Sequence, residues 1–198
     1  MRYGADHAET TRLQIIAAAA AEIRTYGPQG VSVARLMKNV GLTHGGFYAH
    51  FGSKNDLVTE AVESMFVSTG AFSKAARTSG SDFDRLRAFV RAYVSRHHRD
   101  APHDGCPLAT LANDIARTHP KVRAAFTLGF SRLCRRLADW LPKTHGTPLE
   151  LAHNLVAQMV GAVSLARALT DPALSDAILR QTRNDLMARI NQIESSLQ

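Results

Sequence analysis

The chain has 198 residues, of which 45% are apolar and 21% are charged, a composition typical of ordinary globular proteins and not of disordered ones. It contains no run of about 18 apolar residues, which argues against a membrane-spanning helix, and its two cysteines are too few for a disulfide scaffold; both points favour a cytoplasmic protein. The net charge of +7 suggests an anionic partner such as nucleic acid. Residues 1–60 carry six Lys/Arg against five Asp/Glu, however, so charge does not point to this N-terminal segment, and evidence for nucleic-acid binding there must come from sequence motifs.

The first predicted helix runs from about residue 11 to residue 26. Apolar residues recur along it at helical spacing and form one face; these are Leu13, Ile16, Ala17, Ala20 and Ile23. Gly27 and Pro28 follow directly and are expected to end the helix.

Two short helices are predicted next, one over residues 33–40 and one from Thr43 to about Phe51. Ser32 and Thr43 are their N-cap candidates, because a hydroxyl oxygen can accept hydrogen bonds from the unpaired N–H groups of a first helical turn. Gly41 separates the two helices and permits a tight turn.

The rest of the chain is also predicted to be helical, since no segment alternates apolar and polar residues as a strand would. A longer helix is expected from about residue 54 to residue 72. Proline- and glycine-containing breaks then separate helices over residues 82–98, 107–117, 120–141, 148–170 and 172–196. The fold class is therefore all-α.

Residues 32–54 have the design of a helix-turn-helix: a bracing helix, a tight turn and a second short helix with its contact residues near its start. Phe47 and Phe51, four residues apart, are expected to face the core. The opposite, outward face is small or polar and leaves room for a DNA groove; it consists of Thr43, His44, Gly45, Gly46, Tyr48 and Ala49.

Four side chains near this face are predicted to bind phosphate groups. These are the Tyr48 hydroxyl, the His50 ring, the Lys54 ammonium, and Ser32 together with the N–H groups of its helix start. Contacts of this kind position a protein on DNA without reading its sequence.

Base reading falls to Thr43 and His44, with Gly45 and Gly46 letting the backbone approach the bases. The face carries no Arg, Asn or Gln, which are the residues that make bidentate base contacts. Part of the specificity is therefore expected to come from DNA shape or from contacts with thymine methyl groups.

Residues from Thr11 to about Val62 resemble the DNA-binding domain of TetR-type transcriptional regulators. The resemblance is carried by Ala20, Gly27, Val31-Ser32-Val33, Gly41-Leu42-Thr43, Gly46-Phe47-Tyr48, His50-Phe51, Ser53-Lys54 and Leu57. Met37 departs from the pattern, since such regulators usually have alanine in the bracing helix. The resemblance implies an all-α homodimer with a small-molecule pocket in its C-terminal domain, and repression that ends when a ligand moves the two DNA-binding heads apart.

On this basis, residues 1–55 are predicted to form a three-helix helix-turn-helix DNA-binding domain, and residues 56–198 a larger helical ligand-binding and dimerisation domain. The predicted function is ligand-responsive transcriptional regulation, as a repressor released from double-stranded DNA by a small-molecule effector. Two-fold symmetry implies a palindromic operator whose half-sites lie about 34–36 Å apart, or a multiple of that distance. The long helix from residue 54 is the expected transmitter between the two domains.

Two apolar stripes in the last helices favour a dimer interface built from helices 148–170 and 172–196. The first stripe consists of Leu151, Leu155, Met159, Ala162, Val163 and Ala166. The second consists of Leu174, Ile178, Leu186, Ile190, Ile193 and Leu197. The alternative is that both stripes only complete the chain's own core.

Cys106 directly precedes Pro107 at a predicted helix start and has histidines nearby. A cysteine in such a place can have a lowered pKa and become nucleophilic, which makes Cys106 a candidate sensor of electrophiles or oxidants. The alternatives are an unreactive capping residue, or a zinc site that Cys106 shares with His103 and a second histidine. Cys134 is expected to be packed within its helix.

Aromatic residues in the C-terminal part are candidates for the lining of a ligand pocket: Phe89, Tyr93, Phe126 and Phe130. The chain shows no phosphate-binding glycine loop, paired catalytic carboxylates or nucleophile elbow, so neither an enzyme nor a cofactor is predicted. Two other classes stay open. One is an all-α metal-binding protein or enzyme that uses His97, His103 and Cys106, and the other is a helical adaptor that binds a protein partner.

Overall fold

The computed structural model describes residues 2–67, 70–103, 105–143 and 147–197, and throughout these ranges its regular elements are helices with no strand. The chain divides into two compact units. Unit 1 comprises residues 1–68 and 111–129, and unit 2 comprises residues 69–110 and 130–198. The all-α prediction is confirmed.

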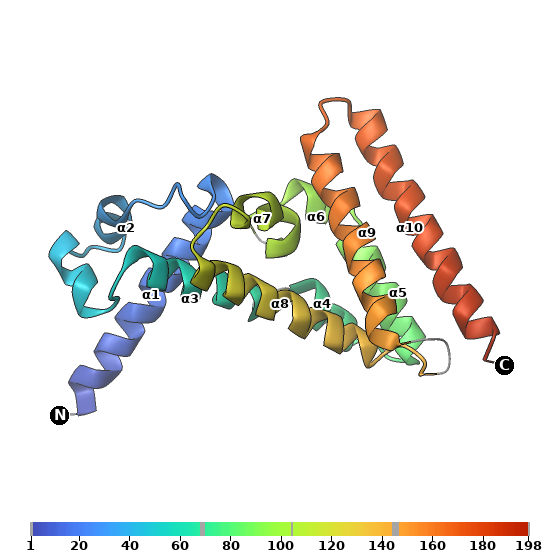
Figure 1. The fold of residues 1–198 in the computed structure, drawn as a ribbon, viewed down its shortest axis with the longest axis horizontal. Coiled ribbons are helices and arrows are strands. Elements are labelled where there is room, and N and C mark those ends of the chain that lie inside the picture. The colour runs from blue at the N-terminus through green and yellow to red at the C-terminus, as the bar shows by residue number, and fades with distance from the viewer. Residues whose placement is uncertain (1, 68–69, 104, 144–146, 198) are drawn as a thin grey trace. The chain divides into compact units, whose positions relative to one another are not determined.

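Unit 1 is built mainly from the N-terminal helices (Figure 1). They are α1 (Arg2–Tyr26), α2 (Val33–Asn39), the 3-10 helix η1 (His44–Ala49) and α3 (Lys54–Val67). The end of α7 (Pro107–Ile115) and the first half of α8 (Pro120–Ala138) complete it. Helix α1 packs along α3, and the core between them holds fully buried side chains such as Ile15, Ile23, Leu57 and Met65.

Helix α1 begins earlier than predicted and buries a different face. The buried positions are Ile15, Ile16, Ala19, Ala20 and Ile23. Leu13 and Ala17, which were expected on that face, are exposed, Leu13 by 56%. The predicted buried face was rotated about the helix axis: the face that packs on the core includes Ile15, and Leu13 lies outside it.

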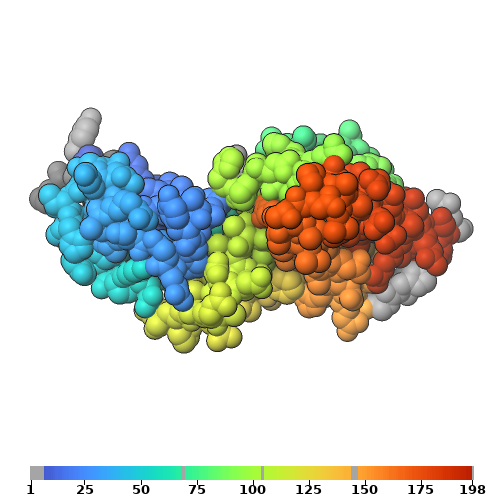
Figure 2. All heavy atoms as spheres, turned by 90° about the horizontal axis from the view of Figure 1, so that it is seen from above, coloured from blue at the N-terminus to red at the C-terminus, as the bar shows by residue number. Residues whose placement is uncertain are grey.

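Unit 2 contains five helices among its described residues, besides parts of α7 and α8. They are α4 (Gly70–Ala76), α5 (Asp82–Tyr93), α6 (Arg96–Asp100) and the pair α9 (Pro148–Ala168) and α10 (Pro172–Ser195). Helices α9 and α10 run side by side in opposite directions, joined by a short turn (Figure 1). Helix α10 also packs on α5, and its surface, in red, lies beside the green α5–α6 segment in Figure 2.

Two predicted helices are divided in the structure. The helix predicted over residues 54–72 appears as α3 and α4, with residues 68–69 outside the described ranges. The helix predicted over residues 82–98 ends at Tyr93, and α6 starts anew after Ser95. The cause is local, because Ser95 Oγ accepts the His98 N–H at 3.1 Å and so forms an N-cap.

The apolar stripe predicted on α9 lies inside unit 2. Leu155, Met159, Val163 and Ala166 are buried in the chain's own core, as are Leu186 and Ile190 of α10. For these residues the structure corrects the interface prediction in favour of its alternative. Within the described ranges, α9 is also the one helix long and apolar enough to cross a membrane by length and composition. The buried stripe accounts for this apolarity, as it does in the core helices of soluble proteins.

Candidate nucleic-acid interface and cavity

The outward side of η1 presents the side chains predicted from the sequence. Thr43, His44, Gly45 and Tyr48 are exposed, Tyr48 by 66%. Gly46 is half-buried, and a side chain at Gly45 would meet nothing within 4 Å. We call this surface, residues 43–46 and 48, the recognition face. It is bare, and its two glycines let another molecule come close to the backbone.

The recognition face is held from behind by buried aromatic and apolar residues. Phe47 is 1% exposed and stacks on Phe51, with 5.5 Å between ring centroids. The Leu42 N–H donates to the Met37 carbonyl at 2.8 Å across the turn. Met37, the departure from the family pattern, is fully buried, and its methyl group lies 3.8 Å from the place where Gly46 lacks a side chain. The small residue at position 46 therefore accommodates the large one at position 37.

The turn and the caps form as predicted. Gly41 has φ +75°, a left-handed conformation that favours glycine. Thr43 Oγ1 accepts the Gly46 N–H at 3.3 Å, and Ser32 Oγ accepts the Arg35 N–H at 3.4 Å. One difference is that the second helix of the motif is a 3-10 helix, not an α-helix.

The predicted phosphate ligands differ in their solvent exposure and in the hydrogen bonds that they already make. The Tyr48 hydroxyl reaches solvent, and His50 is half-buried with its ring beside Phe51. Lys54 is half-buried, and its Nζ donates to the Gln29 carbonyl at 3.0 Å. A phosphate contact by Lys54 would therefore replace an existing hydrogen bond.

Nearby basic residues on α2 were not among the predicted ligands. Arg35 is already engaged, since it pairs with Glu22 at 3.0 Å and lies over the Tyr26 ring at 5.1 Å. Lys38 is exposed in the last turn of the same helix. Its outward position on the bracing helix could have been predicted from the helical period.

Unit 2 contains a cavity of about 480 Å³ at α4, α5 and the segment from α6 to the start of α7. We call it the unit 2 cavity. Its walls include Phe72, Phe89 and Leu133, its floor includes Tyr93, His98 and Cys106, and Lys74, Arg91 and His97 lie at its exposed rim. Of this set, Phe89 and Tyr93 were predicted from the sequence to line a pocket, whereas Cys106 and His97 were candidates for a sensor or a metal site.

Two aromatic residues predicted to line a pocket lie elsewhere. Phe126 belongs to unit 1, where its ring meets that of Phe66 edge to face with 5.7 Å between centroids. Phe130 stacks on His153 at 5.5 Å. Aromatic residues at helical spacing show which helix face is apolar, but not whether core or cavity covers it, so this part of the prediction is corrected.

Cys106 sits directly before α7, as predicted, but its environment is the opposite of the one expected. The thiol is 5% exposed, and burial raises its pKa, although Tyr93 and the amides of Leu108 and Ala109 pull it down. The expectation of a lowered pKa is wrong, because desolvation outweighs the helix start. Cys134 is packed, as predicted, and burial raises the pKa of its thiol to about 11.

His98 joins the end of α5 to the start of α7. Its Nε2 accepts the Cys106 N–H at 3.0 Å, so its proton must be on Nδ1, which donates to the Tyr93 carbonyl at 2.7 Å. Both ring nitrogens are used by the neutral form, and burial is the main cause that lowers the His98 pKa. His98 is therefore occupied as a structural link and is not available as a base for the neighbouring thiol.

No metal site appears among the residues that the structure describes, since no three histidine, cysteine or acidic side chains are grouped to hold an ion. His97 and His103 are exposed, whereas Cys106 is buried. The metal-binding alternative therefore gains no support.

Comparison with known proteins accounts for both units. Residues 15–61 match the family of bacterial regulatory proteins of the tetR type. Residues 83–182, half of the chain, match the tetracyclin repressor-like C-terminal domain. The chain belongs to the TetR family. It is a DNA-binding transcriptional regulator, and the helix-turn-helix of unit 1 is the DNA-binding motif of that family.

Individual TetR-family proteins are similar over nearly the whole length of the chain. An uncharacterised HTH-type transcriptional regulator of Mycobacterium tuberculosis is 25% identical over 190 residues, which cover 90% of this chain and 95% of the relative. Two crystal structures share the fold. A TetR regulator from Chloroflexus aurantiacus is 24% identical with a TM-score of 0.77 and coverage of 97% and 98%. Reduced NemR of E. coli is 19% identical with a TM-score of 0.76 and coverage of 89% and 95%.

Proposed function

We propose that this TetR-family regulator is a homodimeric, cytoplasmic and non-enzymatic repressor that leaves a palindromic operator when a small molecule occupies the unit 2 cavity. One observation carries the DNA-binding part. The recognition face is bare and glycine-rich, yet it is backed by the fully buried Phe47. A rigid, exposed and uncharged helix surface of this kind suits insertion into a major groove.

Within this proposal, Thr43 and His44 meet the bases, and Gly45 and Gly46 allow the backbone to approach them. Tyr48, His50, Lys54 and Ser32 contact phosphates on either side. Each residue keeps the role predicted from the sequence. Lys54 exchanges its bond to Gln29 for a phosphate.

The test is an operator selection with the purified protein, followed by binding assays with Tyr48→Ala. The wild-type protein should enrich a palindrome, and the variant should bind it at least about tenfold more weakly while it remains a dimer. Arg85→Gln, an exchange on α5, is the matched control and should bind as the wild type does. Unchanged affinity of Tyr48→Ala would contradict the assignment of the recognition face.

We propose that dimerisation uses the exposed faces of α9 and α10, and not the buried stripes. Ala157, Gly161 and Leu165 follow one another at four-residue spacing on α9. Leu165 is 58% exposed, and a side chain at Gly161 would meet nothing within 4 Å. Leu174 of α10, 48% exposed, adds a further apolar contact. Small residues beside exposed leucines suit close packing of helices between two copies.

Leu165→Glu tests this interface by light scattering, since a charge there should convert dimers to monomers. Leu13→Glu is a matched control, because Leu13 is equally exposed at 56% but belongs to unit 1. A dimer that persists in Leu165→Glu would rule out this face.

Modification of Cys106 is proposed as a second way to release DNA, because this thiol lines the unit 2 cavity. Its raised pKa means that the thiol is protonated at neutral pH, so reaction should be slow and should accelerate with rising pH. Iodoacetamide should release the wild-type protein and Cys134→Ser from the operator, but not Cys106→Ser. Equal release of all three proteins would remove the sensor role.

A further inference from the structure

The floor of the unit 2 cavity holds one polar group that no oxygen or nitrogen atom of the described chain satisfies. Tyr93 lines the cavity and is 1% exposed, and its phenol oxygen is buried without a hydrogen-bond partner among the described residues. Burial, with a contribution from the neighbouring Cys106 thiol, raises the phenol pKa well above its usual value. The hydroxyl therefore keeps its proton, and the acceptor that faces it is the Cys106 thiol, a weak one. A buried donor with no strong acceptor is an arrangement that folded proteins generally avoid.

The other polar groups around Tyr93 are already paired. Ser95 Oγ donates to the Ala92 carbonyl at 2.8 Å and accepts the His98 N–H at 3.1 Å. Both ring nitrogens of His98 are used, one of them by the backbone of Cys106. What a bound molecule must bring to this floor is thus an acceptor for the Tyr93 hydroxyl.

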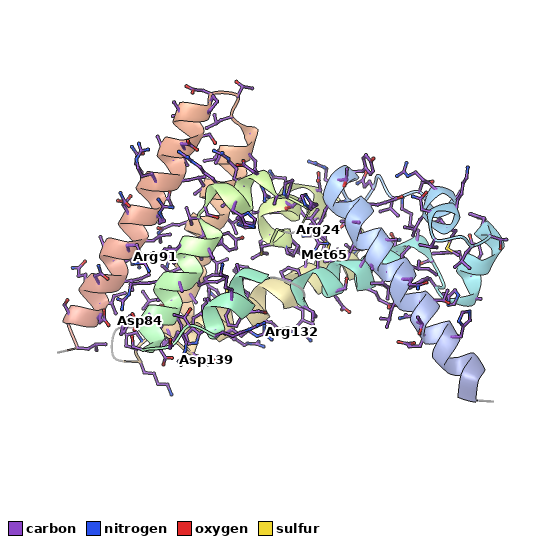
Figure 3. All side chains as sticks on the ribbon, turned by 180° about the vertical axis from the view of Figure 1, so that it is seen from behind. Arg24, Met65, Asp84, Arg91, Arg132 and Asp139 are labelled. Atoms are coloured by element: carbon purple, nitrogen blue, oxygen red, sulfur yellow. The ribbon has the colours of Figure 1, made fainter. Side chains whose placement is uncertain are left out.

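The charges around the cavity favour an anion. Two cationic side chains, Lys74 and Arg91, lie at its rim, and none of the lining residues that the structure describes is acidic; Figure 3 shows Arg91 on α5. Behind the floor, half-buried Arg167 donates to three uncharged acceptors: the carbonyls of His98 (2.6 Å) and Arg99 (3.1 Å), and Thr110 Oγ1 (3.0 Å). Its positive charge acts on Tyr93 and Cys106.

The walls of the unit 2 cavity suit the apolar part of a bound ligand. Phe72, Phe89 and Leu133 line the cavity, and the Phe72 ring packs edge to face on Phe89 with 5.9 Å between centroids. Phe72 also stacks flat on Trp140, at 4.7 Å and an interplanar angle of 2°. The cavity volume of about 480 Å³ lies within the usual range for small-molecule sites.

We infer that the unit 2 cavity binds an amphipathic monocarboxylate, whose carboxylate accepts the Tyr93 hydroxyl above Arg167 and whose apolar body lies against Phe72 and Phe89. The Tyr93 hydroxyl is a single donor on the cavity floor, which suits a ligand with a single carboxylate. The inference rests on the proposed function only in taking this cavity as the effector site. It adds the chemical class of the effector and the residue that selects it.

Trp140, the single tryptophan of the chain, provides the measurement because it stacks on a cavity wall. The full-length protein is titrated with 4-phenylbutyrate and octanoate, and separately with their neutral primary amides, while Trp140 fluorescence is followed and calorimetry gives an independent Kd. Each acid should bind at least about tenfold more tightly than its amide, since hydrogen bonds to charged groups are the stronger ones.

Tyr93→Phe removes the donor and keeps the ring that packs on Phe89 and His98. It should weaken binding of both acids by about tenfold or more and bring their affinity close to that of the amides. Its ligand-free melting temperature should equal or exceed that of the wild type, because the buried donor that is lost has only the weakly accepting Cys106 thiol beside it. Tyr26→Phe, at an exposed position in unit 1, should leave acid binding unchanged.

The rim charges should contribute less. Arg91→Gln should weaken acid binding about two- to threefold at low salt, and Arg132→Gln, an exchange on α8 outside the cavity lining, should have no effect (Figure 3). Amides that bind as tightly as acids, or Tyr93→Phe that binds acids as the wild type does, would overturn the inference. Failure of both acids to bind at about 1 mM, the weak end of useful affinities, would overturn it as well.

Operator release is measured separately, so that the two proposals can fail independently. Acids that bind but leave the operator complex intact would support the ligand class and contradict release through this cavity. Release by a different class of molecule, with no acid binding, would leave the regulator's function standing and remove the inference.

Discussion

The recognition face of unit 1 and the floor of the unit 2 cavity present polar groups in opposite ways. On the recognition face the side chains are exposed, as with Tyr48, and the structure behind them is a dry aromatic stack. On the cavity floor the polar groups are themselves buried, and all but the Tyr93 hydroxyl are paired within the chain. The first set is open to water in the free protein, whereas the remaining donor of the second set faces only the weakly accepting Cys106 thiol among the described residues until a ligand brings a stronger acceptor.

In unit 1, the residues expected to bind DNA are therefore different from those that stabilise the fold. In unit 2, the same residues stabilise the fold and face the unit 2 cavity. A side chain on the recognition face can be exchanged with little effect on folding, since surface substitutions usually change stability by less than about 0.5 kcal/mol. A floor residue such as His98 links two helices and faces the cavity at once. The following substitutions test that separation, beginning with the largest expected effect.

Two adjacent aromatic residues should behave in opposite ways. Phe47→Ala empties a fully buried site and should lower the free energy of unfolding of unit 1 by about 3–5 kcal/mol. Tyr48→Ala, at a 66% exposed position, should change it by less than about 0.5 kcal/mol. Urea unfolding followed by circular dichroism measures both. A large loss of stability in Tyr48→Ala would show that the recognition face supports the core and is not a separate functional surface.

Two glycines of the same motif sharpen the contrast. Gly41 has φ +75° and open space around it, so Gly41→Ala should cost about 1–2 kcal/mol from backbone strain alone. Gly45 is equally open but has no positive φ, so Gly45→Ala should leave the melting temperature unchanged and weaken operator binding by crowding the groove. Thermal melts and operator titrations of both variants separate the two effects. Gly45→Ala with full operator affinity would contradict close backbone approach at that position.

Acid should weaken unit 2 through His98. Its pKa in the folded protein is lowered from 6.5, mainly by burial, and the charges of Arg167 and His97 add to that effect. The unfolded chain therefore takes up this proton at a higher pH than the folded chain does. The contribution of His98 is complete above about pH 6.5 and is lost as the pH falls towards the folded value.

Trp140 fluorescence during urea unfolding reports this loss for unit 2. Stability should fall between about pH 7.5 and about pH 5.5 in the wild type and fall less steeply in His98→Gln. His103→Gln is the matched control because His103 is exposed. An identical pH slope in the wild type and His98→Gln would mean that His98 is not the group that titrates.

The helix-turn-helix of unit 1 could be predicted from the sequence better than the unit 2 cavity could, because its features depend on local contacts. The Ser32 and Thr43 caps and the Gly41 turn depend on neighbours within four residues, so the sequence pattern contains them. The Ser95 cap that divides α5 from α6 is equally local and was missed because the apolar pattern runs on past it.

The cavity depends on contacts between residues far apart in the chain. Phe89 lines it and Phe126 does not, although both are aromatic residues in amphipathic helices. The position of Cys106 at a helix start could be predicted, but its raised pKa could not, because burial depends on the elements packed around it. The roles of the predicted DNA contacts stay predictions, because the structure shows how exposed these side chains are but not which bases or phosphates they bind.

The smallest expected effect concerns Lys54 of unit 1, a half-buried cation that is already hydrogen-bonded within the chain. Its Nζ already donates to the Gln29 carbonyl at 3.0 Å, so phosphate binding exchanges one hydrogen bond for another and gains mainly from charge. Lys54→Gln should therefore lower operator affinity by less than about tenfold and reduce the salt dependence by about one phosphate contact per protomer. Lys74→Gln, at the rim of the unit 2 cavity, should leave both unchanged. A full salt slope in Lys54→Gln, together with a lower melting temperature, would assign Lys54 to holding the Gln29 backbone and leave Tyr48 and His50 as the phosphate ligands.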